Sequence, residues 1–253
     1  RKKVGVVCGG YSSEHKISIE SGETVFSKLD RKKWEPFLII VEKSKWSGKD
    51  DRGNIYSVSK GDLKLTFNEK TIKIDLIFNL IHGSLGENGQ LAALCEILEI
   101  PITSCDSYNA ALTFNKRDCL SVLREWKIPT AKYFTIDKDD DIDVDLIIKK
   151  LGLPCFVKAN RSGSSFGIFK VYDKINLLPS IKKALKYDTQ LIIESNLNGL
   201  EVSVGTARYE NEIQVFPITE IISNNDFFDY AAKYEGQSEE ITPARIEKSL
   251  EKK

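Results

Sequence analysis

The sequence predicts a mixed α/β and α+β fold, in which an N-terminal domain with a doubly wound parallel sheet precedes an α+β part. Three observations lead to this prediction. Short apolar runs alternate with helical patterns over residues 3–98, which is typical of β-α-β units. A compact set of strand and helix patterns follows between residues 133 and 194, and longer β-patterned stretches begin after Gly199.

The first part of the chain carries the β-α-β alternation. Lys3–Cys8 is an apolar run bounded by Gly9 and Gly10, which predicts a buried strand. Polar, turn-rich residues 44–74 contain alternating stretches that suit a hairpin. Further strands are expected over residues 34–41 and 76–81, and helices over residues 14–29 and 89–98. Ligands of such a parallel sheet are expected at the carboxyl ends of its strands.

The rest of the chain predicts a different architecture. Strand patterns occur at residues 133–136, 155–158, 168–171 and 190–194, and helix patterns at residues 115–126, 146–151 and 178–185. Two longer β-patterned stretches follow at residues 201–208 and 212–222. We therefore expect three domains, which cover residues 1–104, 105–196 and 197–253.

Composition excludes several classes of protein. The 253 residues include 37 basic and 37 acidic side chains, so no net charge draws the chain to nucleic acid or to an anionic membrane. No apolar run approaches the roughly 20 residues that a membrane helix needs. Five cysteines without a CxxC pair argue against a disulfide framework and favour a reduced, cytoplasmic protein. We expect neither nucleic acid nor a membrane as a partner.

A glycine- and serine-rich loop, Ala159–Gly167, separates two strands that are expected to be antiparallel. Glycines let the backbone approach a ligand, and hydroxyls and free amides can donate hydrogen bonds to phosphate oxygens. Lys158 adds a positive charge at the end of the preceding strand. No helix follows the glycines, so the loop differs from a Walker loop. Taken alone, it is better explained as a flexible hairpin turn.

Carboxylates and a histidine mark other strand ends. Glu194 ends an apolar strand and Glu201 follows it, and a carboxylate at such a place needs donors such as an adenine amino group or ribose hydroxyls. A solvated strand end is an equal explanation. His82 follows a buried strand in a loop with three glycines, where a ligand site and a structural role are equally well supported. Glu14 stands at the equivalent end of the first strand, where a glycine turn and a helix cap explain the residues fully.

Six segments, taken together and in order, resemble the D-alanine–D-alanine ligases of the ATP-grasp superfamily. They are GGYSSEHKIS, IHGSLGENG, ALTFNK, FVKANRSGSSFG, IIESNLNGLEVSV and DFFDYAAKYEGQSEEITPARI. The resemblance implies a Rossmann-like N-terminal domain and a two-part ATP-grasp fold whose C-terminal part is incomplete in this sequence. It also implies a cytoplasmic homodimer that joins two D-alanines for peptidoglycan synthesis, with ATP, Mg²⁺ (or Mn²⁺) and an acyl-phosphate intermediate.

The resemblance assigns roles to single residues. Glu14 matches a glutamate that binds the ammonium of the first D-alanine, and His82 matches a histidine near the carboxylate of that substrate. The expected ATP contacts are Lys116, Lys158, Ser164, Ser165, Glu194, Leu197, Glu201 and Lys233. Lys233 and Tyr234 match a mobile loop that closes the site. Glu14, Ser164 and Tyr234 are implied to form a hydrogen-bonded catalytic link.

The metal ligands are not identified by the sequence. The resemblance implies an Arg-x-Asp motif and a Glu-x-Asn motif after the ITPARI segment, and the sequence ends at Lys253 without either. We expect these ligands beyond Lys253, in a chain that is truncated or partly given. A nucleotide-binding module without catalysis is the alternative from another class. A D-Ala–D-lactate ligase is the second enzyme alternative, although such enzymes usually carry Phe where this chain has Tyr234.

Tyr234→Phe is expected to shift acceptor preference from D-alanine toward D-lactate at lower pH, where the amine of D-alanine is mostly protonated. The change removes a hydroxyl, and its implied partners lose a hydrogen bond worth about 1–3 kcal/mol if they stay buried. Product analysis of the full-length protein, with both acceptors at equal concentration across pH, measures the ratio. An unchanged ratio of dipeptide to depsipeptide would show that Tyr234 does not set the choice.

Overall fold

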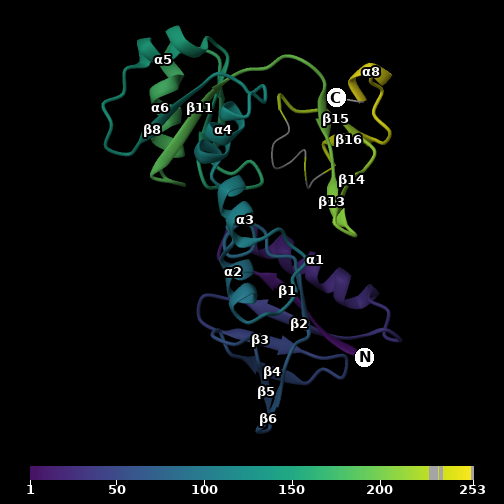
Figure 1. Cartoon of the computed structure of the whole chain (residues 1–253). Coiled ribbons are helices and arrows are strands. Elements are labelled where there is room, and N and C mark those ends of the chain that lie inside the picture. Colours follow the sequence, from purple (N-terminus) through teal and green to yellow (C-terminus); the bar gives the residue numbers. More distant parts are fainter. Residues whose placement is uncertain (228–232, 234–235, 252–253) are drawn as a thin grey trace. The chain divides into compact units, whose positions relative to one another are not determined.

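The computed structural model describes residues 1–227, 233 and 236–251, and it groups the chain into two compact units (Figure 1). The first unit contains residues 1–130 and 160–163, and the second contains residues 131–159 and 164–253. Each unit has a hydrophobic core of its own. The division into three domains at residues 104 and 196 stays a prediction.

A seven-stranded mixed sheet forms the centre of the first unit, with the order β6-β5-β4-β3-β2-β1-β7. Its strands are β1 (Lys2–Gly9), β2 (Trp34–Val41), β3 (Trp46–Lys49), β4 (Ile55–Val58), β5 (Leu65–Phe67), β6 (Lys70–Ile72) and β7 (Leu76–Asn79). β1 pairs in parallel with both β2 and β7, which confirms the predicted parallel core. Strands β3 to β6 extend this core as antiparallel hairpins made from the turn-rich residues 44–74.

Four helices belong to the first unit: α1 (His15–Lys28), α2 (Gln90–Ile97), α3 (Ser107–Phe114) and α4 (Lys116–Glu125). α3 was not expected from the sequence. The Asp106 side chain caps it by accepting a hydrogen bond from the Asn109 N–H. Asn115, which is extended, separates α3 from α4 and caps α4 through the Asp118 N–H. The short polar cap therefore starts a new helix directly after the previous one ends.

The second unit contains a four-stranded antiparallel sheet with the order β10-β9-β11-β8. Its elements are β8 (Tyr133–Asp137), α5 (Val144–Leu151), β9 (Cys155–Ala159), β10 (Ile168–Val171), α6 (Lys174–Ala184) and β11 (Gln190–Ser195). One face of the sheet packs on α5 and α6, with Val157 and Ile193 meeting Ile147 and Ile181 in the core. Because side chains alternate along a strand, Phe156 and its partners on the adjacent strands, Lys170 and Glu194, point to the other face.

The remaining residues of the second unit form smaller sheets. β12 (Glu201–Ser203), β15 (Thr219–Ser223) and β16 (Ser238–Ile241) make one, β13 (Thr206–Tyr209) and β14 (Glu212–Val215) make another, and α8 (Lys248–Glu251) follows. Each predicted long stretch is thus two strands. The buried Glu220 carboxylate accepts two hydrogen bonds of 2.8 Å from the Arg245 guanidinium. This bidentate pair fastens the chain after β16 to β15.

Two general properties concern membranes and thiols. In the part of the chain that the structure describes, every helix is too short or too polar to cross a bilayer. All five cysteines carry free thiols. Burial raises the pKa of the Cys8 thiol to about 12 and that of Cys95 to about 11, so both are inert at neutral pH.

α1 lies on the sheet at a distance that only a glycine permits. A Cβ built on Gly22 would lie 2.6 Å from both Cβ and Sγ of Cys8, on β1. Around this contact Val4, Val6 and Leu38 form a small core with partly buried side chains of α1. The close approach of helix and strand therefore depends on the missing side chain.

Gly22→Ala should lower the free energy of unfolding by about 1–3 kcal/mol, because the added methyl group overpacks the contact with Cys8. Alanine favours the helix over glycine by about 1 kcal/mol, so a net loss means that the clash dominates. Urea unfolding measures the difference. Gly61→Ala is the control, since a Cβ there meets nothing within 4 Å. A Gly22 variant as stable as the wild type would contradict the close packing.

Candidate functional site

Two loops of the first unit, which follow β1 and β7, are joined by side-chain hydrogen bonds. The Ser12 hydroxyl donates to the His82 carbonyl over 2.7 Å, and its oxygen accepts from the Glu14 N–H over 3.2 Å. The Ser18 hydroxyl on α1 donates to the Leu80 carbonyl over 2.6 Å. These bonds place Glu14 and His82 at neighbouring carboxyl ends of the parallel strands, where such sheets bind ligands.

Two glycines bring backbone up to the buried carboxylate of Glu14, which is 3% exposed. A Cβ on Gly83 would lie 3.2 Å from Oε2 of Glu14, and a Cβ on Gly163 would lie 2.8 Å from it. Gly83 has a φ of +71°, which glycine adopts without strain. Gly163 comes from the glycine- and serine-rich loop, whose residues 160–163 belong to the first unit. The structure thus brings that loop to Glu14.

Glu87 also belongs to this group, although it was not among the predicted site residues. Its Oε1 lies 3.9 Å from Nδ1 of His82. Desolvation raises the pKa of the Glu87 carboxyl, and the charge of Glu14 adds to the rise, whereas His82 and Lys116 oppose it. The four groups therefore share one electrostatic environment. The signal was present in the sequence, since Glu87 lies within the IHGSLGENG segment.

The start of the glycine- and serine-rich loop is fastened to the N-terminus of α4. Nζ of Lys116 donates to the carbonyls of Ser162 and Asn160 over 2.6 and 3.3 Å. The fully buried Asn160 side chain accepts from the Arg117 N–H and donates to Oδ1 of Asn115, both over 2.8 Å. A lysine at a helix N-terminus is a favourable place for an anion. Lys116 is therefore held where a phosphate contact is feasible.

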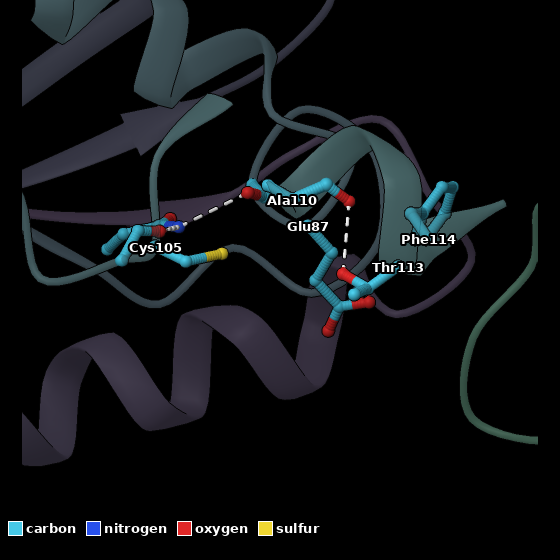
Figure 2. Close-up of a pocket in the computed structure, with 8 residues that line it drawn as sticks. Glu87, Cys105, Ala110, Thr113 and Phe114 are labelled. Carbon is cyan, nitrogen blue, oxygen red and sulfur yellow. Dashed lines mark hydrogen bonds between the residues drawn. The ribbon is translucent and has the colours of Figure 1, made fainter. Parts of the chain in front are cut away.

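A pocket of about 310 Å³ opens beside the Glu87–His82 pair (Figure 2). In Figure 2 the Glu87 side chain lies near Thr113 of α3, and Cys105, in the loop before α3, lies further away. The pocket is lined by Asn79, Gly86, Glu87, Ser104, Cys105, Ala110, Thr113 and Phe114. Both polar and apolar side chains face this space, and Glu87 connects it to His82.

In the second unit the structure pairs two of the predicted residues. Lys158 on β9 forms an ion pair with Glu194 on β11, and both side chains are largely buried. The Lys158 ammonium also lies 5.4 Å from the centre of the Phe156 ring, within the range of a cation–π contact. The Lys158–Glu194 pair therefore holds both charges on the sheet face that lies opposite α5 and α6.

The rest of the glycine- and serine-rich loop has unusual backbone angles. Ser164 and Ser165 have φ values of +44° and +63°, in the left-handed region that few non-glycine residues adopt. The Ala159 N–H donates to the Gly167 carbonyl over 3.0 Å and closes the loop between β9 and β10. Such strained positions cluster at binding sites. The predicted antiparallel arrangement of the two flanking strands is confirmed.

The other predicted site residues are placed as follows. Glu201 begins β12, and both Glu201 and Leu197 are exposed. Lys233 is a partly buried residue of helical conformation. Tyr234 lies outside the described residues. Glu14, His82 and Lys116 belong to the first unit, and the remaining described site residues belong to the second.

The expectation that the metal ligands lie beyond Lys253 stays a prediction. Among the described residues, no three histidine, cysteine, aspartate or glutamate side chains are grouped so that they can hold a metal ion. These residues alone therefore do not form a complete set of protein ligands for a metal ion.

Comparison with known proteins decides the family. A family model described as D-ala D-ala ligase N-terminus matches residues 3–105, and one described as D-ala D-ala ligase C-terminus matches residues 122–253. A D-alanine–D-alanine ligase of Flavobacterium johnsoniae is 50% identical over 252 residues, which are 100% of this chain and 78% of the relative. The chain belongs to the D-alanine–D-alanine ligase family. The predicted family is confirmed.

Solved structures of this ligase family share the fold. The VanG D-Ala:D-Ser ligase of Enterococcus faecalis has a TM-score of 0.80 at 29% identity, and the match covers 100% of this chain and 79% of that one. D-alanyl-alanine synthetase A of Vibrio cholerae has a TM-score of 0.83 over 98% of this chain and 76% of its own, and at 24% identity it supports the fold alone. The predicted ATP-grasp fold is confirmed, and so is the prediction of an ATP-dependent ligase.

Glu87→Gln should make the unfolding free energy of this ligase less sensitive to pH. Because the folded state raises the pKa of Glu87 above 4.5, the folded state favours the protonated form, and this stabilisation is lost as pH rises through the folded pKa. Between pH 4 and pH 7 the free energy of unfolding of the variant should therefore rise relative to that of the wild type. The rise should be about a few tenths of a kcal/mol, because the Glu87 side chain is half-exposed. Urea unfolding at both pH values measures this gain.

The matched control is Glu125→Gln, at an exposed position of α4. Parallel stability curves for wild type and the Glu87 variant, from acid to neutral pH, would contradict the assigned environment of Glu87.

Proposed function

We propose that this chain joins two D-alanines to D-alanyl-D-alanine with ATP as the second substrate, in peptidoglycan precursor synthesis. The observation that carries the proposal is the buried Glu14 carboxylate, which is approached by the backbones at Gly83 and Gly163. Membership of the D-alanine–D-alanine ligase family supports it.

The first D-alanine is proposed to bind in the first unit. Its ammonium needs a desolvated carboxylate, which Glu14 provides, and its carboxylate needs a donor, for which His82 is suitably placed. Lys116 at the N-terminus of α4 offers a cation for a phosphoryl group close to the same loops. The three groups match the ammonium and the carboxylate of D-alanine and the phosphoryl group that the carboxylate accepts.

ATP is proposed to bind in the second unit. The amides and hydroxyls at Ser164 and Ser165 suit phosphate oxygens, and Lys158 supplies a cation on the adjoining strand. Carboxylates suit the adenine amino group and the ribose hydroxyls, and the resemblance assigns these contacts to Glu194 and Glu201. Leu197 offers an apolar surface for the purine, and Lys233 is a further phosphate contact of this proposal.

The chemistry follows from the weakness of a carboxylate as an acyl donor. An acyl phosphate of the first D-alanine is a competent donor, and the second D-alanine attacks it as a neutral amine, with phosphate as the leaving group. Cationic side chains offset negative charge on a transferring phosphoryl group, and Lys116 and Lys158 are the phosphate contacts that the resemblance implies. Exclusion of water protects the acyl phosphate from hydrolysis, and Tyr234 belongs to the loop proposed to exclude it.

The proposal also includes Mg²⁺ (or Mn²⁺) as cofactor, a cytoplasmic location and a homodimer. Membership of the D-alanine–D-alanine ligase family is the main support for these three features. One surface of the first unit supports the dimer. Ile97 and Tyr108 are 79% and 71% exposed on α2 and α3, and these helices are held together beside them by a 2.7 Å hydrogen bond from the Ser107 N–H to Glu96. Large exposed apolar side chains on adjacent helices suit a protein interface.

A direct assay tests the activity. The full-length protein is incubated with ATP, Mg²⁺ and D-alanine, alone and with D-serine or D-lactate as competing acceptor, and phosphate release and product masses are measured. The similarity to a D-Ala:D-Ser ligase makes D-serine the second candidate acceptor. D-Ala-D-Ala as the main product supports the proposal. Binding of ATP without any product would favour a module that binds nucleotides without catalysis.

Gly163→Ala should raise KM for D-alanine about tenfold, which corresponds to about 1.4 kcal/mol. The added Cβ lies 2.8 Å from Oε2 of Glu14, and the flexible carboxylate moves aside more easily than the backbone does. KM for ATP and the melting temperature should change little. Gly61→Ala is again the control. An unchanged KM for D-alanine in the Gly163→Ala variant would show that Glu14 does not bind the substrate.

A further inference from the structure

A charged cluster on the second unit links residues that are far apart in sequence. Nζ of Lys170, on β10, donates to Oδ1 of Asp226 over 2.9 Å and to its carbonyl over 3.2 Å. The Tyr172 hydroxyl donates to the same carboxylate oxygen, across 54 residues of sequence. Lys170 is largely buried, with 14% of its side chain exposed, against 51% for Asp226. The proposed function gives none of these three residues a role.

Aromatic contacts extend the cluster to the proposed ATP contacts. Phe227, which follows Asp226, packs edge to face on Phe156 with ring centroids 5.5 Å apart. The ammonium groups of Lys158 and Lys170 lie 5.4 and 5.5 Å from the centre of the same Phe156 ring. A single ring, that of Phe156, therefore lies beside two lysines and in T-shaped contact with Phe227.

The strand register explains how these groups meet. Phe156 is the Cα partner of Lys170 on one side and of Glu194 on the other, and paired residues point to the same face of a sheet. This face lies opposite the core that packs on α5 and α6. Two lysines beside one ring repel each other, and each has its own carboxylate: Glu194 for Lys158 and Asp226 for Lys170.

We propose that Asp226 is a positioning residue of the nucleotide site. Its bonds to Lys170 and Tyr172 hold Phe227 against Phe156, and they neutralise Lys170 so that Lys158 keeps its place for the nucleotide. This inference rests on the proposed function, because it takes Lys158 as an ATP contact. Without Asp226, the Lys170 ammonium would repel Lys158 and would compete with it for Glu194.

The electrostatics agree with this arrangement. The hydrogen bonds from Tyr172 and Lys170 hold the pKa of Asp226 below its usual value. The hydrogen bond with Asp226 raises the pKa of Lys170 above the ordinary lysine value. Both groups therefore carry their charges at neutral pH, and the ion pair is present under assay conditions.

Calorimetric titration of the full-length protein with ATP tests the inference. Asp226→Asn should weaken ATP binding about tenfold, the loss expected when a charge-assisted contact is broken. Asp226→Glu should restore most of the affinity. Tyr172→Phe, which removes one hydroxyl and leaves the ring, should weaken binding by a smaller factor. In steady-state assays KM for ATP should rise in the Asn variant, with kcat and KM for D-alanine nearly unchanged.

Asp145→Asn is the matched control, because it removes an exposed ion pair with Lys174 in the same unit. An ATP affinity of the Asp226→Asn variant within twofold of the wild type would overturn the inference. An equal loss in the Asp145 variant would also overturn it, since it would indicate a general effect of charge. If the wild type itself binds no ATP, both the proposed function and the inference fail. If the wild type binds ATP and the Asp226→Asn variant binds it equally well, only the inference fails.

Discussion

The candidate substrate site of the first unit is arranged around one buried carboxylate at the edge of a parallel sheet. A buried charge is costly unless polar groups approach it closely, and the Glu14 carboxylate is approached by backbone on two sides, at Gly83 and Gly163. Any larger residue at either position would place a carbon atom within 3.2 Å of the carboxylate. The same constraint explains why Ser12 bridges the two loops, since its hydroxyl fixes the distance between Glu14 and the His82 carbonyl. At Gly163 the atom nearest to an added Cβ is Oε2 of Glu14, whereas at Gly83 it is Cβ of Ser12, so the carboxylate and the serine bridge together favour glycine at these positions.

The second unit also has largely buried charged side chains, which lie on one face of a sheet. Its helices cover one side of β10-β9-β11-β8, and the other side carries lysines and carboxylates that lie close to aromatic rings. Each of the two lysines there has a carboxylate partner, with Glu194 for Lys158 and Asp226 for Lys170. Because paired charges lose less on leaving water than single ones, this face can be polar and partly buried at once. A surface of this kind suits a nucleotide, which has both an apolar base and charged phosphates.

Much of this architecture could be predicted from the sequence, and the exceptions have physical causes. The strand at 34–41 has the predicted bounds, because a run of apolar β-formers between polar residues leaves little choice. The helix predicted at 178–185 begins at Lys174, because Asp173 caps it and the helix continues through Pro179. Gly205 and Pro217 lie where the two predicted long strands divide. Local pattern cannot reveal the contact of Asp226 with Lys170, which depends on how the chain folds back on itself.

The glycine- and serine-rich loop contributes residues to both units, and so to both proposed substrate sites. Residues 160–163 belong to the first unit, where Lys116 holds the carbonyls of Asn160 and Ser162 and where Gly163 faces Glu14. From Ser164 onward the loop belongs to the second unit and returns to β10. The proposed D-alanine site and the proposed nucleotide site therefore use consecutive residues of one loop. A reaction that moves a phosphoryl group from ATP to an amino-acid carboxyl needs both substrates to be held in register. A continuous backbone between their contacts limits how far the two proposed sites can separate at this loop, because the Cα atoms of Gly163 and Ser164 stay about 3.8 Å apart across a trans peptide.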